Sequence, residues 1–319
     1  MTVRERGTAV RDGREWGQPW SVAVLSPWRG TGASLVTATA GALIDAEMGA
    51  KGQDVVLMDA DVENAGLTAL LDAWRGGGSG GGSGGGSGFG AGFGSGIGSG
   101  FVDEQACGLL GFAKEETVAL GDRAAQPMLR GLRSRDGLSR DMSLLTGLRG
   151  RGSSAFTERR DLPEIVGRAT ESLAEVAGCL LVDCGTGWGP CARRVCETVE
   201  HVFLVGPPDG RTHPAVRRLT AGLEQAGLLR KLAGYVANRP GPGPRLSGRN
   251  PRNRVGAGPS RDTLAVRTIL DLPYDPRAAQ TVAQGALPGP QSPYGKAFRE
   301  GLEALEPDLF RTGFGPGGH

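Results

Sequence analysis

The sequence predicts one doubly wound α/β domain, with a mostly parallel sheet of about seven strands and helices on both faces. From Trp20 onward, short apolar runs alternate with amphipathic stretches, which is typical of parallel α/β sheets. A glycine-containing loop at 26–34 also stands directly between the first apolar run and the first helical stretch. The 319 residues are enough for a domain of this kind.

The apolar runs and helical stretches give the expected elements. We expect strands near 21–26, 54–59, 142–146, 179–183, 201–205, 232–238 and 266–271. We expect helices near 33–49, 161–177, 190–198, 212–228, 276–284 and 294–305. Apolar residues make up only 39% of the chain because 56 glycines and 20 prolines dilute them, so a sizeable core is still expected.

The domain is predicted to span 20–310, between a disordered tail at 1–19 and a flexible tail at 311–319. A tract at 76–100 is almost entirely glycine and serine and predicts a flexible linker inside the domain. Two alternatives remain for residues 101–140. They form helices that cover the site or contact a partner, or they form a poorly ordered segment.

A second insertion, at 239–261, is rich in arginine, proline and glycine and has no acidic residue. Its arginines are Arg239, Arg245, Arg249, Arg252, Arg254 and Arg261. A flexible cationic loop of this kind can contact DNA or an acidic lipid surface. The alternative is a solvated loop without a ligand.

Charge and cysteine content indicate where the protein acts. Thirty-six basic residues against 34 acidic ones give a net charge of +2, which does not by itself indicate a nucleic-acid partner. No apolar run approaches the ~20 residues that span a bilayer, and no signal peptide is recognisable. We therefore expect no transmembrane segment and a cytoplasmic location.

Four of the five cysteines cluster in the sequence, as Cys179, Cys184, Cys191 and Cys196. Their spacing is unlike that of a zinc site. We interpret them as small buried apolar side chains, in a chain whose odd cysteine count fits a reducing compartment.

The loop Ser26-Pro27-Trp28-Arg29-Gly30-Thr31-Gly32-Ala33-Ser34 follows an apolar run and precedes a helix. This is the context of a phosphate-binding P-loop, whose backbone N–H groups and helix N-terminus hold phosphates. The consensus G-x-x-x-x-G-K-[ST], laid over 27–34, keeps Gly32 and Ser34. Ala33 stands in place of the lysine that reaches the β- and γ-phosphates.

Two further apolar strands end in carboxylates. Asp59 and Asp61 end the strand near 54–59, and Asp183 ends the strand near 179–183. Because the carboxyl ends of parallel strands face the ligand crevice, we expect these side chains beside the loop. There a carboxylate can hold Mg²⁺ through water or orient an attacking water.

These motifs together resemble the MinD/ParA superfamily of P-loop ATPases with a deviant Walker A loop, over most of 20–305. The family loop K-G-G-x-G-K-[ST] is similar to residues 28–34, and its D-A-D-x-x-N-x-x-L segment is similar to 59–67. Further similar segments are the Walker B strand with its exit at 181–187, the N-R element at 238–239, and the late segment at 270–285.

The resemblance implies ATP or ADP with Mg²⁺ as ligand, and it implies which residues hold them. Nucleotide contacts fall on Arg29, Gly30, Thr31, Gly32, Ala33, Ser34 and Asn238. Magnesium would be held through Ser34, Asp59 and Asp183, and Asp59 and Asp61 would be catalytic if the protein is active.

Two departures from the family loop predict weak activity. Trp28 replaces the lysine that crosses a nucleotide-sandwiched dimer, and Ala33 replaces the lysine that neutralises the β- and γ-phosphates. Loss of such a contact removes several (~3–5) kcal/mol of binding in a poorly solvated site. If nucleotide binding has been lost, the aspartates would remain as hydrogen-bond acceptors for loop N–H groups.

Three functions remain open. The first is a spatial-positioning or scaffold factor for cell division, partitioning, or pilus or secretion-system localisation, with weak or no ATP hydrolysis. The second is an ATPase switch in which Arg29 contacts phosphate and ATP drives homodimer formation. The third is a nucleic-acid-tethering module that uses the arginine loop. The protein partner or cargo is not indicated, and recruitment to the membrane or nucleoid is compatible with the first function.

The last predicted helix, 294–305, places Ala297, Phe298, Leu302 and Leu305 on one face. Its polar face is mixed in charge, whereas a membrane-anchoring helix is rich in Lys and Arg. We therefore expect this helix to pack on the sheet.

Overall fold

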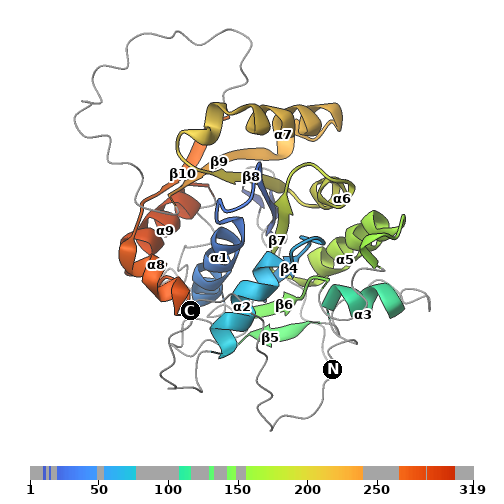
Figure 1. Cartoon of the computed structure of the whole chain (residues 1–319), viewed down its shortest axis with the longest axis horizontal. Helices are drawn as coiled ribbons and strands as arrows, with labels where there is room; N and C mark the ends of the chain where they lie inside the picture. Colours follow the sequence, from blue (N-terminus) through green and yellow to red (C-terminus); the bar gives the residue numbers. More distant parts are fainter. Residues whose placement is uncertain are drawn as a thin grey trace, which may run out of the picture.

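A computed structural model shows the arrangement of the chain (Figure 1). The residues that the structure describes are 10–11, 14–15, 20–48, 54–76, 108–115, 129–132, 142–148, 156–239, 266–284 and 286–305.

A sheet of eight strands forms the centre of the molecule, in the order β10-β9-β8-β3-β7-β4-β6-β5. Seven of these strands run parallel to their neighbours. They are β3 (Trp20–Ser26), β4 (Val55–Asp59), β6 (Met142–Leu145), β7 (Cys179–Thr186), β8 (His201–Gly206), β9 (Leu232–Asn238) and β10 (Thr268–Leu272). The eighth, β5 (Arg130–Leu132), pairs antiparallel with β6 at the edge.

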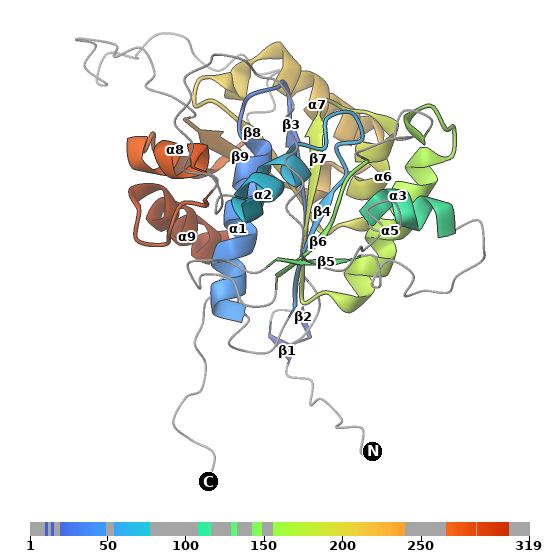
Figure 2. The same cartoon turned by 60° about the horizontal axis from the view of Figure 1, so that its bottom comes forward.

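Helices cover both faces of the sheet, as Figure 2 shows. On one face lie α1 (Ala33–Met48), α2 (Gly66–Gly76), α8 (Pro276–Ala283) and α9 (Pro293–Leu305). On the other lie α3 (Gly108–Glu115), α5 (Leu162–Val176), α6 (Pro190–Thr198) and α7 (Pro214–Gln225). Because the central strands are covered on both faces, β3 and β4 are buried throughout and read as continuous apolar runs.

The predicted fold class is confirmed, with all seven expected strands present. The strand β5 was not predicted, because three residues give too short a pattern to recognise. The helix expected at 212–228 is shorter: a separate 3₁₀ turn occupies Gly210–Thr212, and α7 begins at Pro214. The His213 ring accepts a hydrogen bond from Ala215 N at 3.2 Å and so caps the start of α7.

The insertions are described only in part. Within 101–140, α3 packs against α5 through buried Leu109 and Phe112, so this part does not line the site described below. The tract at 77–100 and the arginine-rich stretch from 240 to 261 lie outside the described residues. Of the predicted tail at 1–19, Val10–Arg11 and Arg14–Glu15 form a small antiparallel ladder, β1 and β2.

Burial of the cysteines follows the prediction for three of the four. Cys179, Cys184 and Cys196 are buried, whereas Cys191 is only partly buried. Cys184 lies inside β7 and not beyond the strand, because β7 continues to Thr186.

The helix α9 packs on the sheet, as predicted. Phe298 and Leu302 are fully buried among residues of the α1 side of the core. Arg299 of α9 forms ion pairs with Glu47 of α1 and with Glu303 of its own helix. Among the described helices, none combines the length and apolar character needed to cross a membrane.

We predict that Phe298→Ala lowers the free energy of unfolding by about 3–5 kcal/mol, since it removes a fully buried aromatic ring. Urea denaturation followed by circular dichroism measures the change. Lys296→Ala, at an exposed position of the same helix, is the control and should stay within about 0.5 kcal/mol. Equal, small losses for both variants would show that α9 is not part of the cooperative core.

Candidate functional site

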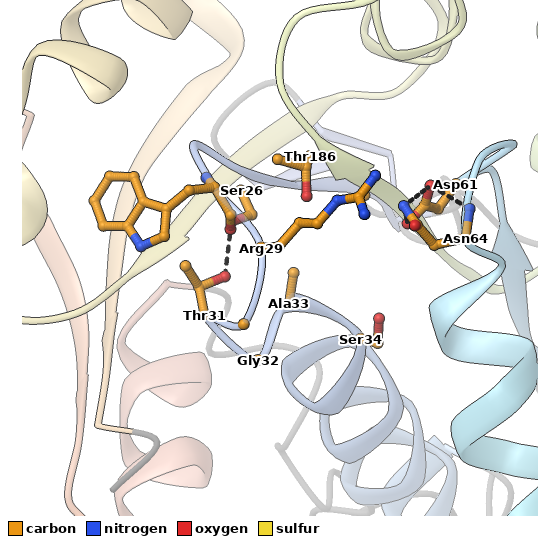
Figure 3. Close-up of a pocket in the computed structure, with 12 residues that line it drawn as sticks. Ser26, Arg29, Thr31, Gly32, Ala33, Ser34, Asp61, Asn64 and Thr186 are labelled. Carbon is orange, nitrogen blue, oxygen red and sulfur yellow. Dashed lines mark hydrogen bonds between the residues drawn. The ribbon is translucent and has the colours of Figure 1, made fainter. Parts of the chain in front are cut away.

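A cavity of about 350 Å³ opens at the carboxyl ends of the central strands. The loop between β3 and α1 forms most of its wall, and the segments that follow β4 and β7 complete it (Figure 3). Its lining residues are Ser26, Trp28, Arg29, Gly30, Thr31, Gly32, Ala33, Ser34, Asp61, Asn64, Gly185 and Thr186. The cavity therefore lies where ligands bind in open parallel sheets.

The loop has the backbone shape of a phosphate-binding loop. Gly30 and Gly32 both have positive φ, at 78° and 85°, a conformation that disfavours other residues. At Gly32 a side chain would also collide with the amide of Asn238. Arg29 fits without backbone strain because Ala65 is the only described non-glycine residue with positive φ.

Buried polar contacts hold this loop in place. The hydroxyls of Ser26 and Thr31 are hydrogen-bonded at 2.7 Å across the turn. The Asn238 side-chain amide, at the end of β9, donates to the Thr31 carbonyl oxygen at 2.7 Å. The Tyr294 hydroxyl of α9 donates a hydrogen bond to the side-chain oxygen of Asn238 at 3.4 Å. The loop is therefore fixed by the protein itself, without a ligand.

The helix α1 begins directly after the loop, at Ala33. The first N–H groups of a helix have no acceptor within the helix and carry a partial positive charge. The cavity thus has the backbone donors that a P-loop uses for phosphate. Figure 3 shows the Ala33 methyl group at the start of α1, on the cavity side, where a lysine would otherwise extend.

Asp183, at the centre of the sheet, supports the start of α1. Its carboxylate accepts a hydrogen bond from the Ser34 hydroxyl at 2.6 Å and from Gly185 N at 3.0 Å. The side chain has no exposed surface, and burial raises the pKa of Asp183 to about 6.

Asp59 is the neighbour of Asp183, because the parallel register of β4 and β7 pairs these two residues. Its carboxylate accepts hydrogen bonds from Thr68 N and the Thr68 hydroxyl, both at 2.7 Å, and from Asp61 N at 3.1 Å. Burial and the negative charge of Asp183 raise the pKa of Asp59 to about 7. The cavity lining does not include Asp59.

Asp61 lies at the mouth of the cavity and organises the β4–α2 loop. Its carboxylate accepts hydrogen bonds from Asn64 N and the Asn64 side-chain amide at 3.1 Å, and from Glu63 N at 3.3 Å. A side chain at Gly185 would collide with this carboxylate, so the exit of β7 approaches the β4–α2 loop closely.

The side chains of the adjacent residues Trp28 and Arg29 make contacts in different parts of the structure. The Trp28 ring packs against His213, with ring centroids 4.8 Å apart. It also occupies the space beside Gly210 that a side chain there would need. Arg29 extends across the cavity toward Asp61 and Asn64 (Figure 3), and it forms an ion pair with Glu63 at 3.3 Å.

The structure brings most of the predicted site together. The stretch from Arg29 to Ser34 and Asp61 line the cavity, and Asp183 reaches it through Ser34. Asn238, which the resemblance implies as a nucleotide contact, lies beside the loop, and its side-chain amide donates to the Thr31 carbonyl oxygen. The sequence did not indicate Thr68, which positions Asp59, or Tyr294, which contacts Asn238. The one available signal for Thr68 is that a hydroxyl residue stands in the first turn of the helix that follows the D-x-D segment.

The residues fit part of a magnesium nucleotide. The loop backbone, the Ser34 hydroxyl and the adjacent carboxylates match what the diphosphate and its cation require. No group of three His, Cys, Asp or Glu side chains converges on one point within the described residues. A cation here would thus need phosphate oxygens as additional ligands. The lysine that contacts the terminal phosphates is absent.

Comparison of the structure with solved structures identifies the fold. The septum site-determining protein MinD of Pyrococcus horikoshii OT3, complexed with Mg-ADP, matches with a TM-score of 0.55 and 20% identity over 90% of this chain and 96% of that one. A ParA family ATPase from Chlorobium tepidum TLS matches with a TM-score of 0.59 and 14% identity, covering 90% and 98%. A putative plasmid partition protein from Borrelia burgdorferi B31, bound to AMPPNP, matches with a TM-score of 0.59 and 11% identity, covering 91% and 99%.

The chain therefore has the fold of the MinD and ParA family ATPases, as the sequence motifs indicated. At these identities the likeness extends to the fold alone. No protein-family model and no curated protein matches the sequence.

We predict that the metal-free protein is less stable at pH 7.5 than at pH 5. Asp59 and Asp183 have folded pKa values of about 7 and 6, above their ordinary value of 3.8. The folded state therefore binds protons more tightly, and its stability falls as the pH rises from about 4 to about 7. The expected loss is about 1–3 kcal/mol.

Urea unfolding in EDTA at both pH values measures this loss. Asp183→Asn is the matched variant, since the amide oxygen can accept from Gly185 N and the amide NH2 can donate to the Ser34 hydroxyl, while the charge is removed. Its pH dependence over this interval should be weaker than that of the wild type. Identical pH profiles would contradict the assignment of the loss to these carboxyls.

Proposed function

We propose that this chain is a MinD/ParA-like spatial-positioning or scaffold factor that binds a magnesium nucleotide weakly and hydrolyses it slowly or not at all. The observation that carries the proposal is the cavity itself. Its loop backbone and carboxylates are in place, yet Arg29 provides the only positive charge among the described lining residues.

The scarcity of positive charge in the cavity would lower the rate of hydrolysis more than the affinity for nucleotide. Phosphoryl transfer depends on cations placed at the terminal phosphates, where charge is redistributed in the transition state. Phosphates bound at the loop would lie in a cavity that Asp61 also lines, with Asp183 hydrogen-bonded to Ser34. The backbone donors of the loop remain to hold a diphosphate.

The proposed ligand is ATP or ADP with Mg²⁺. Ser34, Asp59 and Asp183 would hold the cation, since Ser34 is hydrogen-bonded to Asp183 and Asp59 is the neighbour of Asp183 on the adjacent strand. Solved relatives in complex with Mg-ADP and with AMPPNP support this choice of ligand. The cation would supply the positive charge that the missing lysines no longer provide.

The proposal also includes where the protein acts and in which process. We propose action in the cytoplasm, with recruitment to a membrane or nucleoid surface through a protein partner. Division and partition roles are those named for the MinD and plasmid partition relatives. A tethering role for the arginine loop has less support, because Arg239, the arginine of this loop that lies within the described residues, is paired with Asp271 at 3.0 Å.

We predict that Ala33→Lys increases ATP affinity at least about tenfold, because it restores a cation beside the terminal phosphates. Isothermal titration with ATP and Mg²⁺ measures the change. Ala33→Gln, of similar length but uncharged, is the control and should not reproduce the gain. A wild-type turnover typical of ATPases in this family, abolished by Asp59→Ala, would instead establish the active ATPase.

We also predict that ATP does not convert the wild type into a dimer. The Trp28 side chain packs on its own chain against His213, so it is not free to replace a lysine that reaches a partner's phosphates. Size-exclusion chromatography with light scattering, with and without MgATP, measures the mass. A dimer that forms with ATP and disappears in Arg29→Ala would support the ATPase switch and contradict this prediction.

A further inference from the structure

Arg29, which lines the cavity, forms an ion pair with Glu63, and this contact joins two loops. Arg29 belongs to the β3–α1 loop, and Glu63 to the β4–α2 loop. Figure 3 shows the Arg29 side chain running from one loop to the other, over the start of α1. A ligand that enters the cavity therefore meets this arginine.

We propose that Glu63 competes with the nucleotide's phosphates for Arg29 and thereby lowers nucleotide affinity in this protein. The inference rests on the proposed function, because it requires that nucleotide binds in the cavity. In the absence of nucleotide, Glu63 holds the Arg29 guanidinium at the rim. When nucleotide binds, the guanidinium leaves Glu63 and contacts phosphate.

The surrounding contacts identify Glu63 as the competitor. Asp61 is also acidic and lines the cavity, but its carboxylate already accepts hydrogen bonds from Asn64 and from the backbone of the same loop. Asp183 is likewise engaged by Ser34 and Gly185. Glu63 is the carboxylate whose contact with Arg29 the structure shows.

The ion pair is weak enough to exchange. Arg29 and Glu63 keep 71% and 74% of their side-chain surface exposed, and exposed ion pairs change an equilibrium by about fivefold at most. A phosphate carries more charge than a carboxylate, and its oxygens suit the planar guanidinium. Phosphate therefore displaces Glu63, at a cost in affinity that equals the strength of the original pair.

A double-mutant cycle measured by isothermal titration with ADP and Mg²⁺ tests the competition between Glu63 and phosphate for Arg29. Glu63→Gln should tighten ADP binding about two- to fivefold, because Arg29 then contacts phosphate without first breaking an ion pair. Arg29→Gln should weaken binding. In the Arg29→Gln background, the additional Glu63→Gln change should have no effect, since the competitor no longer has a cation to hold.

A charge control separates competition from a general field effect. Glu300→Gln removes one negative charge at an exposed position of α9 and should leave ADP binding unchanged. The inference is overturned if Glu63→Gln does not tighten binding, or if its gain persists in the Arg29→Gln background. In either case ADP binding by the wild type would leave the proposed function standing. Failure of ADP to bind the wild type and Glu63→Gln alike would overturn both.

Discussion

The parallel register of β3, β7 and β4 is the constraint on which the site depends. It pairs Val24 with Asp183 and Asp59 with Asp183, so the three strands end at one edge of the sheet. The loop that leaves β3 must then turn over the end of β7, where Asp183 receives the Ser34 hydroxyl. A shift of register by one residue would move these side chains to the other face of the sheet.

This register places two carboxyls side by side in the core, an arrangement that a fold alone does not require. Neutral residues would avoid the unfavourable burial of charge that raises both pKa values. Buried acids with raised pKa values beside a cavity are typical of functional sites. However, Asp59, Asp61 and Asp183 all accept hydrogen bonds from backbone N–H groups, so each also has a structural role in shaping the loops.

Sequence reasoning predicted the parts of the molecule that depend on local pattern. Buried strands such as Val55–Asp59 are apolar over their whole length, and the glycines of the loop mark positions with positive φ. It could not predict contacts between distant segments. Tyr294 and Asn238 lie 56 positions apart, and Thr31 and Asn238 lie 207 apart. For this reason the sequence did not indicate that the Asn238 amide holds the loop through the Thr31 carbonyl oxygen.

The shape of the loop does not depend on the lysines that it lacks. The hydroxyls of Ser26 and Thr31 are hydrogen-bonded across the turn, and the Asn238 amide of β9 donates to the loop. The Trp28 ring packs against His213. All of these contacts lie within the chain, and none of them requires a phosphate or a cation. Trp28 and Ala33 carry no charge, so the cavity has few cations although the backbone donors around it are in place. The shape of the loop and the charge of the cavity are therefore set by different residues, so a change of charge at Trp28 or Ala33 need not alter the backbone of the loop.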